Sequence, residues 1–141
     1  MRKNLGLNFK VLVGAVVATG LLSACQTTKE AANLASLGVS FEWQATDRCS
    51  TSSPAFSITG IPEGTASLQF KMTDLDVPTY NHGGGKVVYS GSGSIPAGSF
   101  SYKGPCPPGG QHNYQFDVKA LNAAGDTILG KGSATRAFPP N

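Results

Sequence analysis

Hydrophobic and polar residues alternate along much of the chain after residue 38. Val39, Phe41 and Trp43 are separated by polar residues, and the same alternation runs through residues 68–72 and 114–120. A period of two places successive side chains on opposite faces of an extended strand, so each run predicts a strand with one face in a core and one in water. Shorter apolar runs predict further strands at residues 55–58, 87–90, 100–102, 127–129 and 133–138.

Glycine and proline separate these runs, and the chain contains 18 glycines and 9 prolines. Turn-forming clusters lie at residues 60–64, 83–85 and 122–126. Many short strands separated by such turns are typical of an antiparallel β-sandwich. We therefore expect an all-β, antiparallel β-sandwich with little helix over residues 39–141. Residues 25–38 lack turn chemistry and a strong apolar stripe, so we expect a tether there, with one short helix around residues 30–37.

The first 24 residues have the layout of a secretory signal. Positive charges at Arg2, Lys3 and Lys10 precede an apolar run over residues 11–22. That run of 12 residues is too short for a helix that crosses about 30 Å of hydrocarbon, and it fits the apolar region of a signal peptide. We therefore expect residues 1–24 to be removed on export.

The apolar run ends in Leu22-Ser23-Ala24-Cys25, which resembles the lipobox of bacterial lipoproteins. The resemblance implies cleavage before Cys25 and a diacylglycerol on its thiol, so that a membrane is a partner of the protein. Two or three acyl chains anchor a protein stably, because each buried methylene contributes about 0.8 kcal/mol. Gln26 stands where enteric sorting rules read Asp, and this favours the outer membrane by analogy. We expect a lipid-anchored protein of the cell envelope that faces the periplasm.

The charge of the exported domain argues against a nucleic-acid partner. The full chain has 11 Lys and Arg against 8 Asp and Glu, a formal net charge of +3. The excess cations are Arg2, Lys3 and Lys10, which leave with the signal, so the exported domain is formally neutral. A neutral domain without a basic run lacks the electrostatic footprint of a nucleic-acid-binding protein.

Two cysteines, Cys49 and Cys106, remain once Cys25 is lipidated. Export leads to an oxidising compartment, where an even pair of cysteines is usually a disulfide. Such a bond would stabilise the fold by about 4 kcal/mol in the chain-entropy treatment. Two separate buried thiols are the alternative. We expect no metal site, because no Cys or His lies two residues from another.

Two polar segments adjoin predicted strands, at residues 72–82 and 102–114. Each leaves or enters an apolar strand, so a packed sheet would hold its polar groups at the rim, where a rigid scaffold positions functional groups well. These segments are the candidates for the chemistry of the chain.

Both segments resemble signatures of the phosphatidylethanolamine-binding protein family, which includes Raf kinase inhibitor protein and bacterial relatives. The first, Asp-Pro-Asp-Ala-Pro with a downstream His, is matched by Asp74-Leu75-Asp76-Val77-Pro78 and His82. The second, Gly-x-x-Pro-Pro-x-Gly closed by His-Arg-Tyr, is matched by residues 104–110 and by His112-Asn113-Tyr114. The resemblance covers about residues 39–122. Leu75, Gly83 and Asn113 depart from the family pattern, which has Pro, often Trp, and Arg at these places.

The resemblance implies a β-sandwich with a small pocket at one end for phosphate, acetate-like ions or phosphorylated head groups. An anion needs donors in a concave site, which an imidazole, a phenol and the N–H groups of a Gly-rich loop can supply. A carboxylate can accept from a histidine and fix its tautomer. The ligand-binding residues implied are Asp74, Asp76, His82, His112 and Tyr114, with Gly104, Pro105, Pro107 and Pro108 shaping the loop.

We therefore expect a non-enzymatic protein that binds a small anionic or phosphorylated ligand. A structural or interaction lipoprotein that binds an envelope protein with the same loops is the alternative, and a hydrolase is third. The run His82-Gly83-Gly84-Gly85 resembles the oxyanion loop of esterases, but the Gly-x-Ser-x-Gly elbow that this chemistry needs is missing. The chain also lacks the glycine-rich nucleotide motifs, so we expect no cofactor. Structural roles remain open for both Asp residues as turn caps, for His112 at a strand end and for Tyr114 in the core, and a structural role is equally open for His82.

Overall fold

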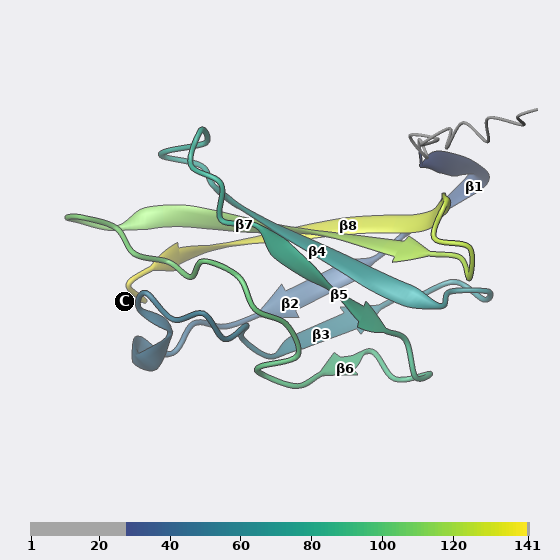
Figure 1. The fold of residues 1–141 in the computed structure, drawn as a ribbon, viewed down its shortest axis with the longest axis horizontal. Coiled ribbons are helices and arrows are strands. Elements are labelled where there is room, and N and C mark those ends of the chain that lie inside the picture. The colour runs from purple at the N-terminus through teal and green to yellow at the C-terminus, as the bar shows by residue number, and fades with distance from the viewer. Residues whose placement is uncertain (1–27, 141) are drawn as a thin grey trace, which may run out of the picture.

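The computed structural model describes residues 28–140 and shows two β-sheets packed against each other (Figure 1). The strands are β1 (Lys29–Ser36), β2 (Gly38–Phe41), β3 (Phe56–Thr59), β4 (Ser67–Asp74), β5 (Gly84–Val88), β6 (Ser94–Ile95), β7 (His112–Leu121) and β8 (Thr127–Phe138), with a short 3-10 helix η1 (Ala45–Asp47). The larger sheet has the order β1-β8-β7-β4-β5 and the smaller has the order β2-β3-β6. All ladders are antiparallel except the parallel pair β1 and β8. The predicted all-β sandwich with little helix is confirmed.

Strands β4 and β7 form the centre of the core, as their alternating residues predict. Their inward side chains face each other in register, with Phe70 opposite Val118 and Met72 opposite Phe116. All four side chains are at most 2% exposed. From the smaller sheet, the ring of Phe56 packs against Phe116 at a centroid distance of 4.9 Å. The two sheets are therefore held together largely by aromatic side chains, which bury large apolar areas.

The structure has strand β1 where we expected a tether over residues 25–38 with a short helix around residues 30–37, so that prediction is wrong. This segment instead pairs in parallel with the edge of β8, with Ser36 opposite Lys131. Unpaired N–H and C=O groups on an edge strand offer an extended segment hydrogen bonds that outweigh a weak local helix preference. Leu37 follows as a buried residue, so the packed domain begins at β1 rather than at residue 39.

Three further predicted strands differ in the structure. The runs at residues 127–129 and 133–138 belong to one continuous strand, β8. The run at residues 100–102 joins no ladder and makes a single bridge, between Ser52 and Ser101. Its aromatic side chains are nevertheless buried, so the apolar run indicates core packing rather than strand pairing.

The predicted disulfide between Cys49 and Cys106 is present, with the two Cα atoms 4.6 Å apart. Backbone hydrogen bonds reinforce it, because Cys49 N–H donates to Pro105 O at 2.8 Å and Gly104 N–H donates to Ser50 O at 2.8 Å. A Cβ at Gly104 would lie 2.3 Å from Ser50 O, so this close approach requires glycine. Residues 104–110, which we call the proline-rich loop, are thus fixed to the segment that follows η1.

The signal segment, the lipobox and Cys25 lie outside the described residues. No helix within residues 28–140 is long and apolar enough to span a membrane.

Candidate functional site

The two candidate loops meet at one end of the larger sheet. Asp74 is the last residue of β4 and His112 is the first residue of β7. Because these strands are antiparallel neighbours, the end of one adjoins the start of the other, and Asp74 stands opposite Tyr114 in the ladder. Just beyond it, Leu75 N–H donates to Asn113 O at 2.8 Å. Residues 38 positions apart in the sequence are therefore side by side.

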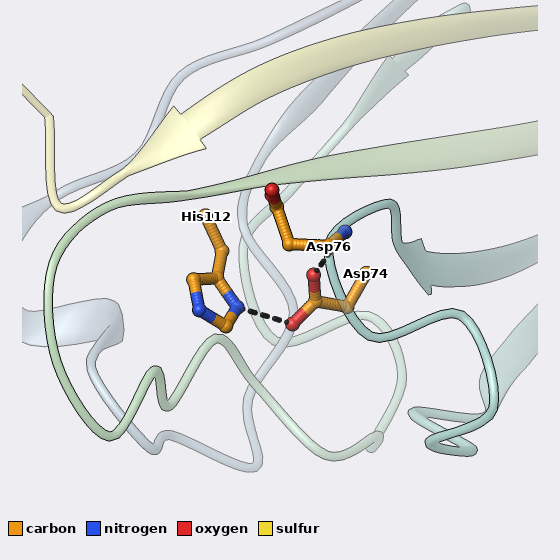
Figure 2. Close-up of side chains that lie close together, drawn as sticks. All are labelled: Asp74, Asp76 and His112. Atoms are coloured by element: carbon orange, nitrogen blue, oxygen red, sulfur yellow. Dashed lines mark hydrogen bonds and ion pairs between the residues drawn. The ribbon is translucent and has the colours of Figure 1, made fainter.

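Asp74 and His112 form a hydrogen-bonded pair, which Figure 2 shows as a dashed line. The distance from His112 Nδ1 to Asp74 Oδ2 is 2.8 Å. An ionised carboxylate only accepts, so Nδ1 carries the proton and donates it. The second ring nitrogen, Nε2, has no hydrogen-bond partner within residues 28–140, and the side chain of His112 is 15% exposed. The pair therefore fixes the imidazole and leaves one nitrogen for another group.

The second oxygen of Asp74 organises the loop that follows β4. Oδ1 accepts from Asp76 N–H at 2.9 Å and from Val77 N–H at 3.1 Å. Burial raises the pKa of Asp74, but the hydrogen bond from His112, the two backbone N–H groups and the charge of His112 together outweigh it, so the pKa lies below its ordinary value. Asp74 thus caps a turn and orients His112 at the same time.

Asp76 ties the two loops together from the solvent side. Its Oδ2 accepts from Asn113 N–H at 2.7 Å, while the residue itself is exposed. Asp74, Asp76 and His112 offer ligand atoms within 4.8 Å of one another, which makes them a group that could hold a metal ion. Both oxygens of Asp74, one of Asp76 and Nδ1 of His112 already have hydrogen-bond partners, so the geometry is that of a hydrogen-bonded network.

Tyr114 lies beneath this network and is only 1% exposed. Burial, followed by the charge of Asp74 and a hydrogen bond with it, raises the pKa of the Tyr114 phenol to about 12, although the Cys106 backbone acts in the opposite direction. The ring also packs against Trp43, at a centroid distance of 6.2 Å. Tyr114 is therefore a core residue whose hydroxyl interacts with Asp74.

His82 lies next to Tyr114 and is buried. Its Nδ1 lies 2.6 Å from Lys103 O, which only accepts, so Nδ1 is protonated. Lys103 N–H donates back to His82 O at 2.9 Å. The ring stands between Tyr80 and Tyr114, at centroid distances of 4.7 and 5.4 Å. His82 thus fixes residues 75–83 to the proline-rich loop and lines the base of the site.

The proline-rich loop contributes backbone more than side chains. Gly104, Pro105 and Pro107 are buried, whereas Pro108 is exposed. Gly109 and Gly110 are also exposed, and their N–H groups make no hydrogen bond to another described residue. The loop therefore presents unpaired backbone donors a few residues before His112.

Sequence reasoning missed a hollow of about 930 Å³ on the outer face of the larger sheet. It is lined by outward residues of β4, β5, β7 and β8 and by Asn81 and Gly83. A second, smaller hollow is lined by Glu42, Trp43 and Arg136 among others. Neither of these two hollows is lined by Asp74 or His112. The sequence feature that could have indicated the larger hollow is the set of polar residues in the alternating strands, which is rich in lysine.

Comparison with known proteins identifies the family and the fold. Residues 26–138 match the phosphatidylethanolamine-binding protein family. No curated protein sequence matches the chain. A phosphatidylethanolamine-binding protein homologue, CT736 of Chlamydia trachomatis, is 17% identical with a TM-score of 0.59, and the match covers 77% of this chain and 99% of that one. YbcL of Escherichia coli, a member of the same family, is also 17% identical with a TM-score of 0.58, covering 74% of this chain and 99% of its own. These two structures share the fold.

Proposed function

Because this chain belongs to the phosphatidylethanolamine-binding protein family, we propose that it binds a small anionic or phosphorylated ligand beside Asp74 and His112, without catalysing a reaction. We further propose that lipid on Cys25 displays this site from a membrane of the cell envelope, with the outer membrane favoured. The lipobox-like Leu22-Ser23-Ala24-Cys25 supports the anchor.

The observation that carries the binding proposal is the orientation of His112. Asp74 accepts from Nδ1, which leaves Nε2 without a partner in the described chain. An anion would accept from Nε2 when the ring carries a proton on both nitrogens, and that hydrogen bond would be charge-assisted. An anion that accepts from Nε2–H would find further donors in the unpaired N–H groups of Gly109 and Gly110.

The same network restricts which anions bind. Asp74 and Asp76 repel an anion, so binding requires a hydrogen-bond donor at His112 Nε2 and is disfavoured for groups of high negative charge. One oxygen of Asp76, Oδ1, has no partner within residues 28–140 and faces solvent. It offers an acceptor to an ammonium group. A zwitterion such as phosphoethanolamine is therefore expected to bind better than phosphate alone.

One feature supports binding rather than catalysis. Within residues 28–140, neither histidine ring hydrogen-bonds to the hydroxyl or thiol of a Ser, Thr or Cys side chain. A Ser, Thr or Cys nucleophile that histidine activates requires such a pair.

Calorimetric titration with phosphate and with phosphoethanolamine tests this function. We expect saturable binding of both ligands, tighter for phosphoethanolamine than for phosphate. His112→Gln should abolish it. Arg136→Gln is the matched control, because Arg136 stands opposite Tyr114 near the same end of the sheet and its removal also takes away one cation. Unchanged binding in His112→Gln, or equal loss in both variants, would overturn the proposal.

A further inference from the structure

Four lysines share the outer face of the larger sheet, the face turned away from β2, β3 and β6. Across the sheet, Lys131 of β8 stands opposite Lys119 of β7. Lys119 in turn stands opposite Gln69 of β4, and Gln69 stands opposite Lys86 of β5. Lys71 lies on the same face of β4, opposite Asp117. We call Lys71, Lys86, Lys119 and Lys131 the basic face. It carries half of the eight Lys and Arg residues in the described chain, which has an equal number of Asp and Glu.

The lining of the hollow is nevertheless positive in sum, because Asp117, opposite Lys71, is its one carboxylate residue. Lys131 pairs with Glu30, but Lys71, Lys86 and Lys119 form no ion pair within residues 28–140. Like charges directly opposite each other in a ladder destabilise a sheet. The facing pair Lys119 and Lys131 therefore costs the sheet some stability, and a bound polyanionic surface would offset that cost.

The basic face is bounded by residues 75–83, which we call the arm. Asn81 and Gly83 of the arm line the 930 Å³ hollow together with Lys71, Lys86, Lys119 and Lys131. Figure 1 shows the arm, between β4 and β5, rising from the side of the larger sheet that faces away from the smaller one. Three apolar or aromatic side chains of the arm are between 41% and 52% exposed: Leu75, Val77 and Tyr80.

The start of β1 lies on this same side in Figure 1. β1 begins at Lys29, so only residues 26–28 separate it from Cys25. Four Cα steps span at most about 14 Å. If Cys25 carries lipid, as the proposed function holds, the start of β1 at Lys29 stays within that distance of the membrane surface.

We propose that the basic face docks on the anionic phospholipid head groups of the membrane that holds the anchor. This inference rests on the proposed lipidation of Cys25 and not on ligand binding at His112. Lysines beside exposed apolar and tyrosine side chains are the composition of a membrane-surface contact. The proposed anchor at Cys25 favours a lipid surface over an acidic protein or a glycan, because it would keep the start of β1 within reach of anionic head groups.

The test uses the acylated protein reconstituted into vesicles of phosphatidylcholine, with or without about one third phosphatidylglycerol, enough to give a negative surface potential. An amine-reactive reagent followed by mass spectrometry measures the labelling of each lysine. We expect Lys71, Lys86 and Lys119 to be labelled several-fold more slowly in the phosphatidylglycerol vesicles. That protection should disappear at about 1 M salt, where the Debye length is about 3 Å.

The variant Ser57→Lys provides the internal control, because Ser57 is exposed on β3 of the smaller sheet. Labelling at position 57 should be the same in both vesicle types. Equal labelling of the three lysines in both vesicle types, in protein that floats with the vesicles, would overturn the docking and leave the anchor intact. Protein that fails to float would overturn the anchor and the docking with it. Protection that appears only with added dextran sulfate would assign the face to a glycan and overturn the lipid proposal.

Discussion

Replacing Asp74 with Asn tests whether one carboxylate holds the two loops together. Asn retains an oxygen that accepts from the N–H groups of Asp76 and Val77, but it removes the charge and the acceptor that faces His112 Nδ1. Hydrogen bonds to charged groups contribute about 1.5–3 kcal/mol each. Asp74 is only 4% exposed, so water compensates little for the loss. We expect Asp74→Asn to lower the free energy of unfolding at neutral pH by about 2 kcal/mol.

The effect should depend on pH in a defined direction. The pKa of Asp74 is lowered in the folded protein, because His112 and two backbone N–H groups outweigh the opposing effect of burial. A carboxyl of this kind stabilises the fold above its unfolded pKa of about 3.9, and that contribution is lost as the pH falls through the folded pKa. The difference between wild type and Asp74→Asn should therefore be full near neutral pH and shrink as the pH falls below about 4.

Urea unfolding at a series of pH values, followed by the fluorescence of Trp43, measures this difference. Glu63→Gln is the matched control, since Glu63 is exposed in a turn and the substitution makes the same chemical change. The control should shift the free energy of unfolding by less than about 0.5 kcal/mol. A pH-independent difference for Asp74→Asn, or one no larger than that of the control, would refute the reasoning.

Three further predictions address the rest of the molecule. Cys49→Ser with Cys106→Ser should lower the free energy of unfolding by about 4 kcal/mol, measured by urea unfolding beside the oxidised wild type; an unchanged midpoint would contradict it. Lys119→Glu should raise stability by about 0.5 kcal/mol at low salt, because Lys119 stands opposite Lys131, and a melting temperature that falls would count against this. Cys25→Ala should yield an uncleaved or soluble precursor. An unchanged mass and unchanged membrane fractionation would contradict the proposed lipid anchor.

The central strands were predictable from the sequence because each buries one face in the core. β4 and β7 have neighbours on both sides and a core beneath them, so their alternation of apolar and polar residues is strict. β1 could not be predicted from the sequence, because its pairing depends on the exposed edge of β8 rather than on its own side chains. The run at residues 100–102 was wrongly predicted as a strand because its aromatic rings are buried, although its backbone joins no ladder.

The site was predictable only in part. Resemblance to the family brought Asp74 and His112 together, and the hydrogen bond between them follows from the antiparallel neighbours β4 and β7. The fixation of His82 by Lys103 O depends on two loops that share no sequence pattern. The basic face was visible only as scattered lysines, because the register that aligns Lys119 with Lys131 is a property of the ladder.

The most direct test of the central claim is an NMR titration of the imidazole nitrogens with phosphoethanolamine. The claim is that Asp74 holds Nδ1 of His112 and leaves Nε2 to bind an anion. A saturable shift of the His112 Nε2 resonance, with Nδ1 remaining protonated throughout, is the predicted result. A His112 ring whose resonances do not move, or move only without saturation, would contradict it.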